Sequence, residues 1–245
     1  MRAALDLEAI AISLRRVQME FDAINQQLSW QRDPMSDEVV ENLLAGYAYV
    51  DALVDAGIDF FVMGQHKHLL ELNTLVLCGR NLERRAEFAA HIEATERHFY
   101  EERQGGIEDI VEWYSRHRHE PAWKLAAGLY VRILSKPQLF IEGNHRTGVL
   151  VASYVLLRNG LPPFVLTVEN ALAYFDPSTV IRGTNKLGLL ALFRLPGIKK
   201  RFARFLRDQP SSDYLLTNDP RAGESEIIIE GNPECLLTIT KPGHP

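Results

Sequence analysis

The chain has 245 residues, of which 46% are hydrophobic and 24% are charged, and its formal net charge is −5. This composition is typical of a globular protein, and the negative charge argues against a dedicated nucleic-acid binder. No apolar run approaches the roughly 20 residues that a membrane helix needs, and two distant cysteines, Cys78 and Cys235, are typical of a reducing compartment. We therefore expect a cytoplasmic protein with no membrane partner.

Apolar residues at helical spacing predict a mainly α-helical first half. The predicted helices cover Leu5–Leu28, Asp37–Ala56, Phe60–Leu77, Leu82–His98 and Ile107–His117. Gly57 and Gly79 follow two of these segments directly, where glycine commonly ends a helix. Gly105-Gly106 is typical of a tight turn, so a short β-hairpin is predicted from His98–Arg103 and Gly106–Asp109.

The second half is also predicted to be helical up to about residue 206. Its helices are expected at Ala122–Ser135, Asn144–Asn159, Thr167–Phe175 and Leu187–Leu206, the last with a bend at Pro196-Gly197. The apolar runs in Glu224–Thr240, on either side of Gly231-Asn232-Pro233, predict a small C-terminal β-hairpin. We expect an N-terminal helical extension over 1–36, a helical domain over 37–208 and a tail over 209–245.

The segment from Phe140 to Gly148 is the strongest candidate for a functional site. It is expected to form a tight loop that opens directly into a helix, where unpaired backbone N–H groups and the helix dipole attract anions. Gly143 would let the backbone approach a ligand, while Asn144 and Arg146 lie at the start of the helix. Glu142 could hold a divalent cation against bound phosphate. The alternative is an ordinary helix start with polar surface residues.

This segment resembles the active-site motif of the Fic/Doc family, His-x-Phe-x-Asp/Glu-Gly/Ala-Asn-Gly/Lys-Arg. The residues at matching offsets are Phe140, Glu142, Gly143, Asn144 and Arg146, and wider similarity extends from about residue 39 to residue 174. The resemblance implies a Fic-like helical bundle that transfers a nucleotidyl or phosphate-containing group to hydroxyls of target proteins. In the adenylylating (AMPylating) members the donor is ATP, and Mg²⁺ is the usual cofactor.

The departures from the motif concern catalysis. Gln138 occupies the place of the catalytic His, and a carboxamide has no useful basicity near neutral pH. His145 replaces the second Gly and is the candidate substitute base. Val149 replaces the second Arg, which resembles a clamp for the terminal phosphate of ATP in adenylylating members. Standard adenylylation is therefore not expected, and a noncatalytic nucleotide- or protein-binding regulatory module is the alternative to an altered transferase.

The resemblance also assigns roles to residues around the motif. Glu142 would hold the metal, and a nucleotide or other phosphate ligand would contact Gly143, Asn144, His145 and Arg146. The predicted hairpin lies where the family carries a flap that captures an extended segment of a target protein; its residues here are His98, Phe99, Tyr100, Gly105 and Gly106.

Two further segments have simpler explanations. Glu41 lies in a stretch that resembles part of the family's inhibitory helix, but the Arg with which it would pair is replaced by Val149, so an exposed helix residue is expected. The basic cluster Arg194–Arg207 is interpreted as a solvated helix face, with an acidic partner, nucleic acid or a membrane surface as alternatives.

Overall fold

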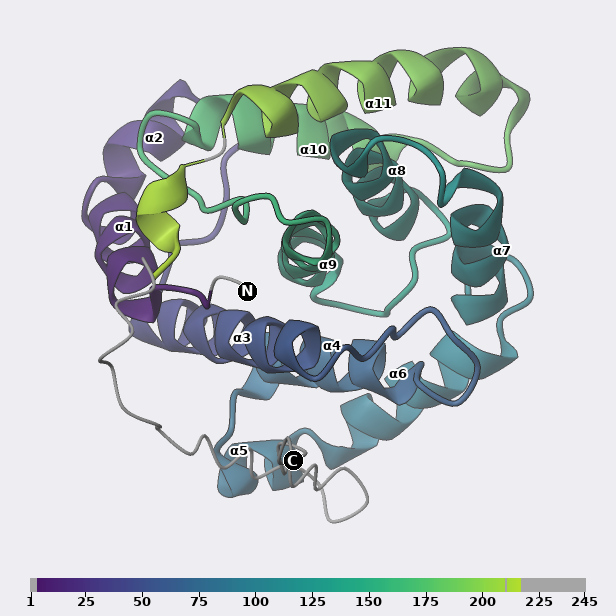
Figure 1. The fold of residues 1–245 in the computed structure, drawn as a ribbon, viewed down its shortest axis with the longest axis horizontal. Helices are drawn as coiled ribbons and strands as arrows, with labels where there is room; N and C mark the ends of the chain where they lie inside the picture. The colour runs from purple at the N-terminus through teal and green to yellow at the C-terminus, as the bar shows by residue number, and fades with distance from the viewer. Residues whose placement is uncertain (1–3, 210, 217–245) are drawn as a thin grey trace, which may run out of the picture.

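A computed structural model describes residues 4–209 and 211–216 of the chain. Within these ranges the regular secondary structure consists of eleven α-helices and one short 3₁₀ helix, and extended residues meet only in two isolated bridges, Leu5 with Leu215 and Lys136 with Asn185. The α-helices, labelled in Figure 1, are α1 (Leu7–Met19), α2 (Phe21–Gln27), α3 (Asp37–Asp55), α4 (Lys67–Cys78), α5 (Leu82–Glu87), α6 (Ala89–Glu101), α7 (Ile107–His117), α8 (Ala122–Leu134), α9 (Asn144–Arg158), α10 (Ala171–Gly183) and α11 (Leu189–Asp208). The 3₁₀ helix is η1 (Ser212–Tyr214).

Helix α9 is the centre of the bundle, and it is seen end-on in the middle of Figure 1. Every residue from Thr147 to Leu157 is buried. A helix that is apolar on all sides is stable only when other elements surround it, and α9 packs against α3, α4 and α8. Its N-terminus, which carries the motif, is consequently fixed by the core of the protein.

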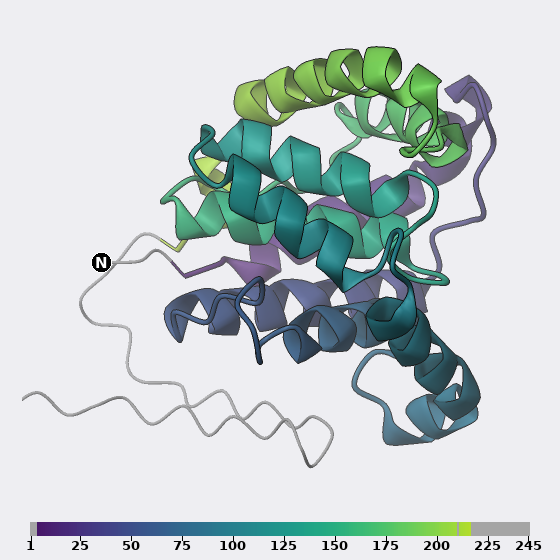
Figure 2. The ribbon, with the colours of Figure 1, turned by 90° about the vertical axis from the view of Figure 1, so that its right-hand side faces the viewer.

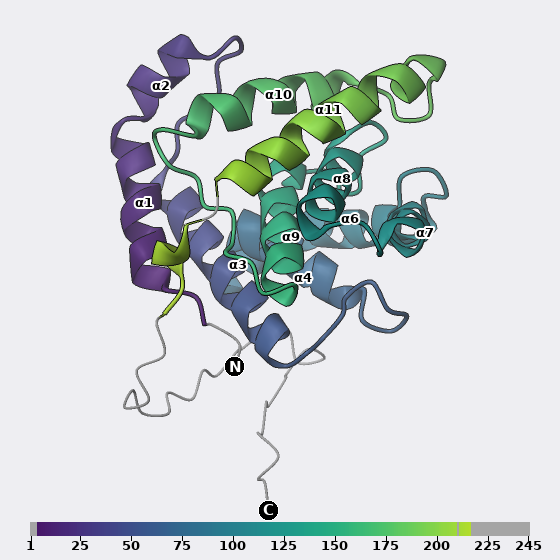
Figure 3. The ribbon, with the colours of Figure 1, turned by 45° about the horizontal axis from the view of Figure 1, so that its top comes forward.

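Two groups of helices enclose α9. Helices α3 and α4 pack against each other on one side, whereas α10 and α11 lie close together over α8, as Figure 3 shows. Helix α1 packs against α3, and their buried residues belong to one hydrophobic core. The proposed division at residues 36 and 208 stays a prediction. Within the described residues, we find no helix with the length and apolar character needed to cross a bilayer.

The predicted β-hairpin at residues 98–109 is wrong. Helix α6 continues to Glu101, Gly105 adopts a φ of +114° in the turn that follows, and α7 begins at Ile107. The reason is tertiary: Phe99 is fully buried, and its ring stacks on that of Phe140 with a centroid distance of 5.6 Å. Helical geometry therefore brings Phe99 onto the core. The predicted C-terminal hairpin within 224–240 lies outside the described residues.

Several helix predictions agree with the structure, notably α3, α7, α8 and α9. The predicted first helix is two helices, and α4 begins only at Lys67. Helix α10 begins four residues later than predicted. In the turn before it, the Asn170 side chain accepts from the Thr167 N–H at 2.9 Å, and the Thr167 hydroxyl accepts from the Asn170 N–H at 3.2 Å. Pro196 lies inside α11.

Candidate functional site

Gly143 forms the junction between the motif loop and helix α9. It adopts the left-handed conformation, with φ +74° and ψ 0°, and no side chain caps the helix. A Cβ at this position would lie 2.8 Å from Nδ2 of Asn73 and 3.3 Å from side-chain atoms of Val76 and Leu77. Both the backbone conformation and the lack of space therefore require glycine here.

The side chain of Asn144 closes the loop on itself. Its Oδ1 accepts a hydrogen bond from the Phe140 N–H at 2.9 Å, and its Nδ2 donates to the Phe140 carbonyl at 2.6 Å. Asn144 is buried, so its amide group shapes the loop. Its backbone N–H, in the first turn of α9, is the group that can face an anion.

Asn73 holds the loop from the side of α4, and the sequence analysis did not identify it. Its Nδ2 donates to the Glu142 carbonyl at 2.9 Å and to the Thr147 hydroxyl at 3.1 Å. Asn73 is 2% exposed. The available signal was an amide side chain within the mostly apolar C-terminal half of α4, since a buried amide needs hydrogen-bond partners.

Arg146 lies half-buried between α9 and the end of α4. Its Nη1 donates to the Val76 carbonyl at 2.6 Å, in the last turn of α4, where the helix dipole favours a cation. Burial lowers the pKa of the guanidinium, whereas the nearby Glu142 carboxylate acts in the opposite direction. The other guanidinium N–H groups remain as potential donors to phosphate.

Glu142 is exposed at the edge of the loop. Its backbone carbonyl is bound by Asn73, so the loop fixes the residue while the side chain stays at the surface. Among the described residues, no group of three or more His, Cys, Asp or Glu side chains converges as a metal site. A single exposed carboxylate of this kind could hold a divalent cation only together with other ligands such as phosphate oxygens, as is common for Mg²⁺.

Gln138 is tied to its neighbours through both its side chain and its backbone. Its Nε2 donates to the Leu134 carbonyl at the end of α8 at 2.9 Å. Its own carbonyl lies 3.0 Å from Nε2 of His98, which places the donated proton on that nitrogen. His98 and Phe99 thus bring the end of α6 against the motif loop, although as a helix instead of a strand.

His145 faces α10. Its Nδ1 lies 2.7 Å from the Tyr174 hydroxyl, and its ring stacks on Phe175 with a centroid distance of 5.7 Å. Burial lowers the pKa of His145 to about 3, and the positive charges of Arg32 and Arg146 contribute. This shift favours the neutral imidazole near neutral pH. The hydrogen-bonding partner of His145 lies on α10, its ring also meets that of Tyr130 on α8 at a centroid distance of 5.9 Å, and the side chain of Gln138 donates to the Leu134 carbonyl of α8.

The remaining motif-related positions carry no charge toward the loop. Val149 is buried, with 6% of its surface exposed, so the place of the second motif Arg belongs to the core. Glu41 is exposed on α3, and its carboxylate lies 3.5 Å from the Arg15 guanidinium. This agrees with its interpretation as a surface residue.

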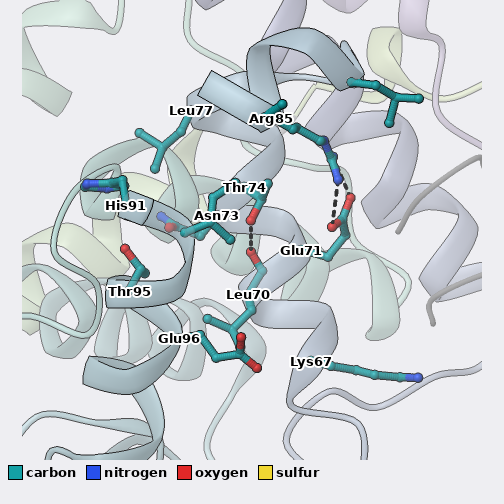
Figure 4. A pocket seen from close by; sticks show the side chains of 13 residues that line it. Lys67, Leu70, Glu71, Asn73, Thr74, Leu77, Arg85, His91, Thr95 and Glu96 are labelled. Atoms are coloured by element: carbon teal, nitrogen blue, oxygen red, sulfur yellow. Dashed lines mark hydrogen bonds and ion pairs between the residues drawn. The ribbon is translucent and has the colours of Figure 1, made fainter. Parts of the chain in front are cut away.

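A cavity of about 440 Å³ adjoins the loop between α4, α5 and α6 (Figure 4). Asn73 and Leu77 line it, and the same two side chains contact the motif loop at Glu142 and Gly143. The paired Glu71 and Arg85 lie on one side of the view in Figure 4, and His91 and Thr95 lie on the other.

Comparisons with known proteins agree with the motif. No protein-family profile matches the chain. Over 141 residues it is 27% identical to protein adenylyltransferase fic-1 of Caenorhabditis elegans, a match that covers 53% of this chain and 26% of that protein. The chain thus spans about a quarter of this relative's length.

A solved structure of a Fic domain containing signaling protein from Bacteroides thetaiotaomicron aligns with a TM-score of 0.45 and 16% identity, over 83% of this chain and 86% of that one. The likeness to Fic proteins is one of sequence: the match to fic-1 and the five motif residues at their matching offsets. The chain is thus similar to a protein adenylyltransferase of the Fic type over 141 residues, and its motif residues resemble those of the Fic family.

Proposed function

We propose that the chain binds a phosphate-containing ligand, in particular a nucleotide, at the start of α9. The observation that carries this proposal is the left-handed Gly143 at a helix start without a side-chain cap. The first backbone N–H groups of α9 are therefore not capped by a side chain and are available to an anion, and Arg146 supplies a cation in the same turn. The relative fic-1 is a protein adenylyltransferase, and this favours a nucleotide as the ligand.

Mg²⁺ is proposed to accompany the ligand. Glu142 is an exposed carboxylate next to the anion-binding loop, and hard cations prefer carboxylate and phosphate oxygens together. Bound there, the cation would neutralise phosphate charge. The residues of the chain would hold the phosphates through the α9 N-terminus and Arg146 and keep the loop in shape through Asn73 and Asn144.

We further propose that the main role of the site is to bind its ligand and that the chain transfers groups weakly or not at all. Gln138 offers a carboxamide already bonded to Leu134, and a positioned base is typically worth ~10²–10⁴-fold in rate. His145, with its pKa lowered to about 3, is a poor proton acceptor at neutral pH. A regulatory module that binds a nucleotide fits these residues best, and the relation to fic-1 supports a weakly active transferase as the second candidate.

Calorimetry tests the ligand. ATP, GTP, CDP-linked and UDP-linked compounds are titrated into the wild type, Arg146→Ala and Arg97→Ala. Arg97 is an exposed arginine on α6 and serves as the matched control. We expect binding by the wild type and the control but not by Arg146→Ala, with unchanged circular dichroism in all three. Equal affinity in Arg146→Ala and the wild type would exclude the proposed phosphate site.

The metal is tested by repeating the titrations with the wild type and Glu142→Gln, in Mg²⁺ and in EDTA. Binding should require Mg²⁺ in the wild type and weaken in Glu142→Gln, because the carboxylate would supply one of the metal's oxygen ligands. Metal-independent binding in both proteins would remove Glu142 from the site.

Transfer of label from ATP to protein separates the two candidate functions. The wild type is expected to label neither itself nor lysate proteins appreciably, and Gln138→His should give weak labelling at best. Robust wild-type labelling that disappears in Arg146→Ala would establish the transferase and exclude the purely regulatory role.

A further inference from the structure

Two buried polar groups without partners line the cavity between α4, α5 and α6. The Oγ1 atom of Thr95 and the Nε2 atom of His91 are both buried and have no hydrogen-bond partner among the described residues. Thr95 is 3% exposed. The two residues are four apart in α6, which places them on the same face of the helix, and both belong to the cavity wall.

Buried polar atoms without a hydrogen-bond partner are uncommon in proteins. Together a hydroxyl and an imidazole nitrogen can present one donor and one acceptor side by side. A ligand with an adjacent donor and acceptor on one edge would satisfy both. The other hydroxyl on this wall, that of Thr74, is already used, since it donates to the Leu70 carbonyl at 3.1 Å.

The charges around the cavity favour a neutral ligand. Arg85 donates to both carboxylate oxygens of Glu71, at 3.2 and 2.7 Å, and these two side chains are only 13% and 12% exposed. The other two ionised residues of the wall, Lys67 and Glu96, carry opposite charges. The walls also include apolar side chains, namely Leu70, Leu77, Leu82, Ala86 and Ile92.

We propose that this cavity binds a neutral heterocycle of nucleoside size, held at its hydrogen-bonding edge by Thr95 and His91. A volume of about 440 Å³ lies within the range of small-molecule sites, and such sites combine apolar walls with a few convergent polar groups. A nucleoside base has this character, with apolar faces and an edge that carries neighbouring donors and acceptors. The inference goes beyond the phosphate site, because its ligand requires neither phosphate nor metal.

Asn73 and Leu77 couple the two sites. Each lines the cavity, and each also touches the motif loop, Asn73 through the Glu142 carbonyl and Leu77 next to Gly143. A ligand in the cavity would rest against the side chains that fix the loop. Occupation of the cavity should therefore stabilise the loop in its present shape.

Titration of the full chain with adenosine, guanosine, cytidine and uridine tests the proposal. At least one nucleoside should bind the wild type. Thr95→Val, which removes the unpaired hydroxyl at nearly constant volume, should weaken that binding by about tenfold, the value of one hydrogen bond. Thr74→Val is the matched control, because it makes the same change in the same wall at a hydroxyl that is already paired, and it should retain the wild-type affinity.

A melting curve and a second variant make the result independent of folding defects. Ligand-free Thr95→Val should melt at or above the wild-type temperature, because it loses a buried hydroxyl without a partner. Thr95→Ser keeps the hydroxyl and should keep the affinity. The proposal is overturned if none of the four nucleosides binds, or if Thr95→Val and Thr74→Val bind equally well.

The same titration distinguishes this proposal from the proposed phosphate site. Nucleoside affinity should be the same in EDTA and in Mg²⁺, and saturating pyrophosphate with Mg²⁺ should not compete. Nucleoside binding that persists when no phosphate compound binds would uphold the cavity and refute the phosphate site. Phosphate binding without any nucleoside binding would do the reverse.

Discussion

Replacing Gly143 with alanine tests the geometry on which the site depends. The residue lies at φ +74°, a conformation that costs a residue with a Cβ about 1–2 kcal/mol. The new methyl group would also lie 2.8 Å from Asn73 Nδ2, so Asn73 must move. That movement weakens its hydrogen bonds to the Glu142 carbonyl and the Thr147 hydroxyl, each worth about 0.5–1.5 kcal/mol.

The backbone cost at Gly143 and the weakened hydrogen bonds of Asn73 together predict a loss of about 2–4 kcal/mol in the free energy of unfolding. For a chain of this length, that corresponds to a fall in Tm of roughly 5–15 °C. Ligand binding at the loop should also be lost, because the first N–H groups of α9 would no longer be held in place. Both effects originate from a single methyl group next to Asn73.

Two other glycines separate the contributions in chemical denaturation. Gly160 has a φ of +72° but nothing within 4 Å of its Cβ position, so Gly160→Ala measures the backbone cost alone. Gly183, the last residue of α10, is equally open and has no positive φ, so Gly183→Ala should be neutral or slightly stabilising. If Gly143→Ala costs no more than Gly160→Ala, the contact with Asn73 has no energetic role and our account of the loop is refuted.

Three further predictions concern buried residues of α6, α9 and α4. Phe99→Ala should destabilise the protein by about 3–5 kcal/mol in urea unfolding, because Phe99 is fully buried on Phe140. Tyr100→Ala, at a position 45% exposed whose ring meets that of Phe99 edge-on, should cost about 0.5–1.5 kcal/mol, and similar values for the two variants would contradict the helical packing of α6. Val149→Arg restores the second motif Arg but buries an unpaired charge, so it should lower the free energy of unfolding by about 4 kcal/mol or more, or prevent soluble expression. A stable and active variant would show that the core can open at this position. Burial lowers the pKa of His68 to about 4, below the unfolded value near 6.5, so the stability that neutral His68 contributes is complete above pH ~6.5 and is lost as the pH falls toward 4. The difference in unfolding free energy between the wild type and His68→Gln should therefore narrow by about 1–3 kcal/mol over that range. A constant difference would exclude a neutral, buried His68.

The sequence by itself determined the helical character of the chain and the location of the candidate site. Apolar periodicity is a local property, so α3, α7, α8 and α9 were predicted nearly to the residue. The motif around Gly143 was recognisable because its residue types and their spacing lie in one continuous segment. The lack of a base at Gln138 followed from the residue type alone.

Tertiary structure decided what the motif residues contact. Asn73 and Glu142 are 69 positions apart, and His145 and Tyr174 are 29 apart, so no local pattern encodes these hydrogen bonds. The predicted hairpin failed for the same reason, because turn residues favour a reversal of the chain, whereas the burial of Phe99 against Phe140 fixes a helix up to it. The differences in local propensity between helix and turn are smaller than the free energy gained by burying one aromatic side chain. Packing therefore determines the structure where it disagrees with local propensity.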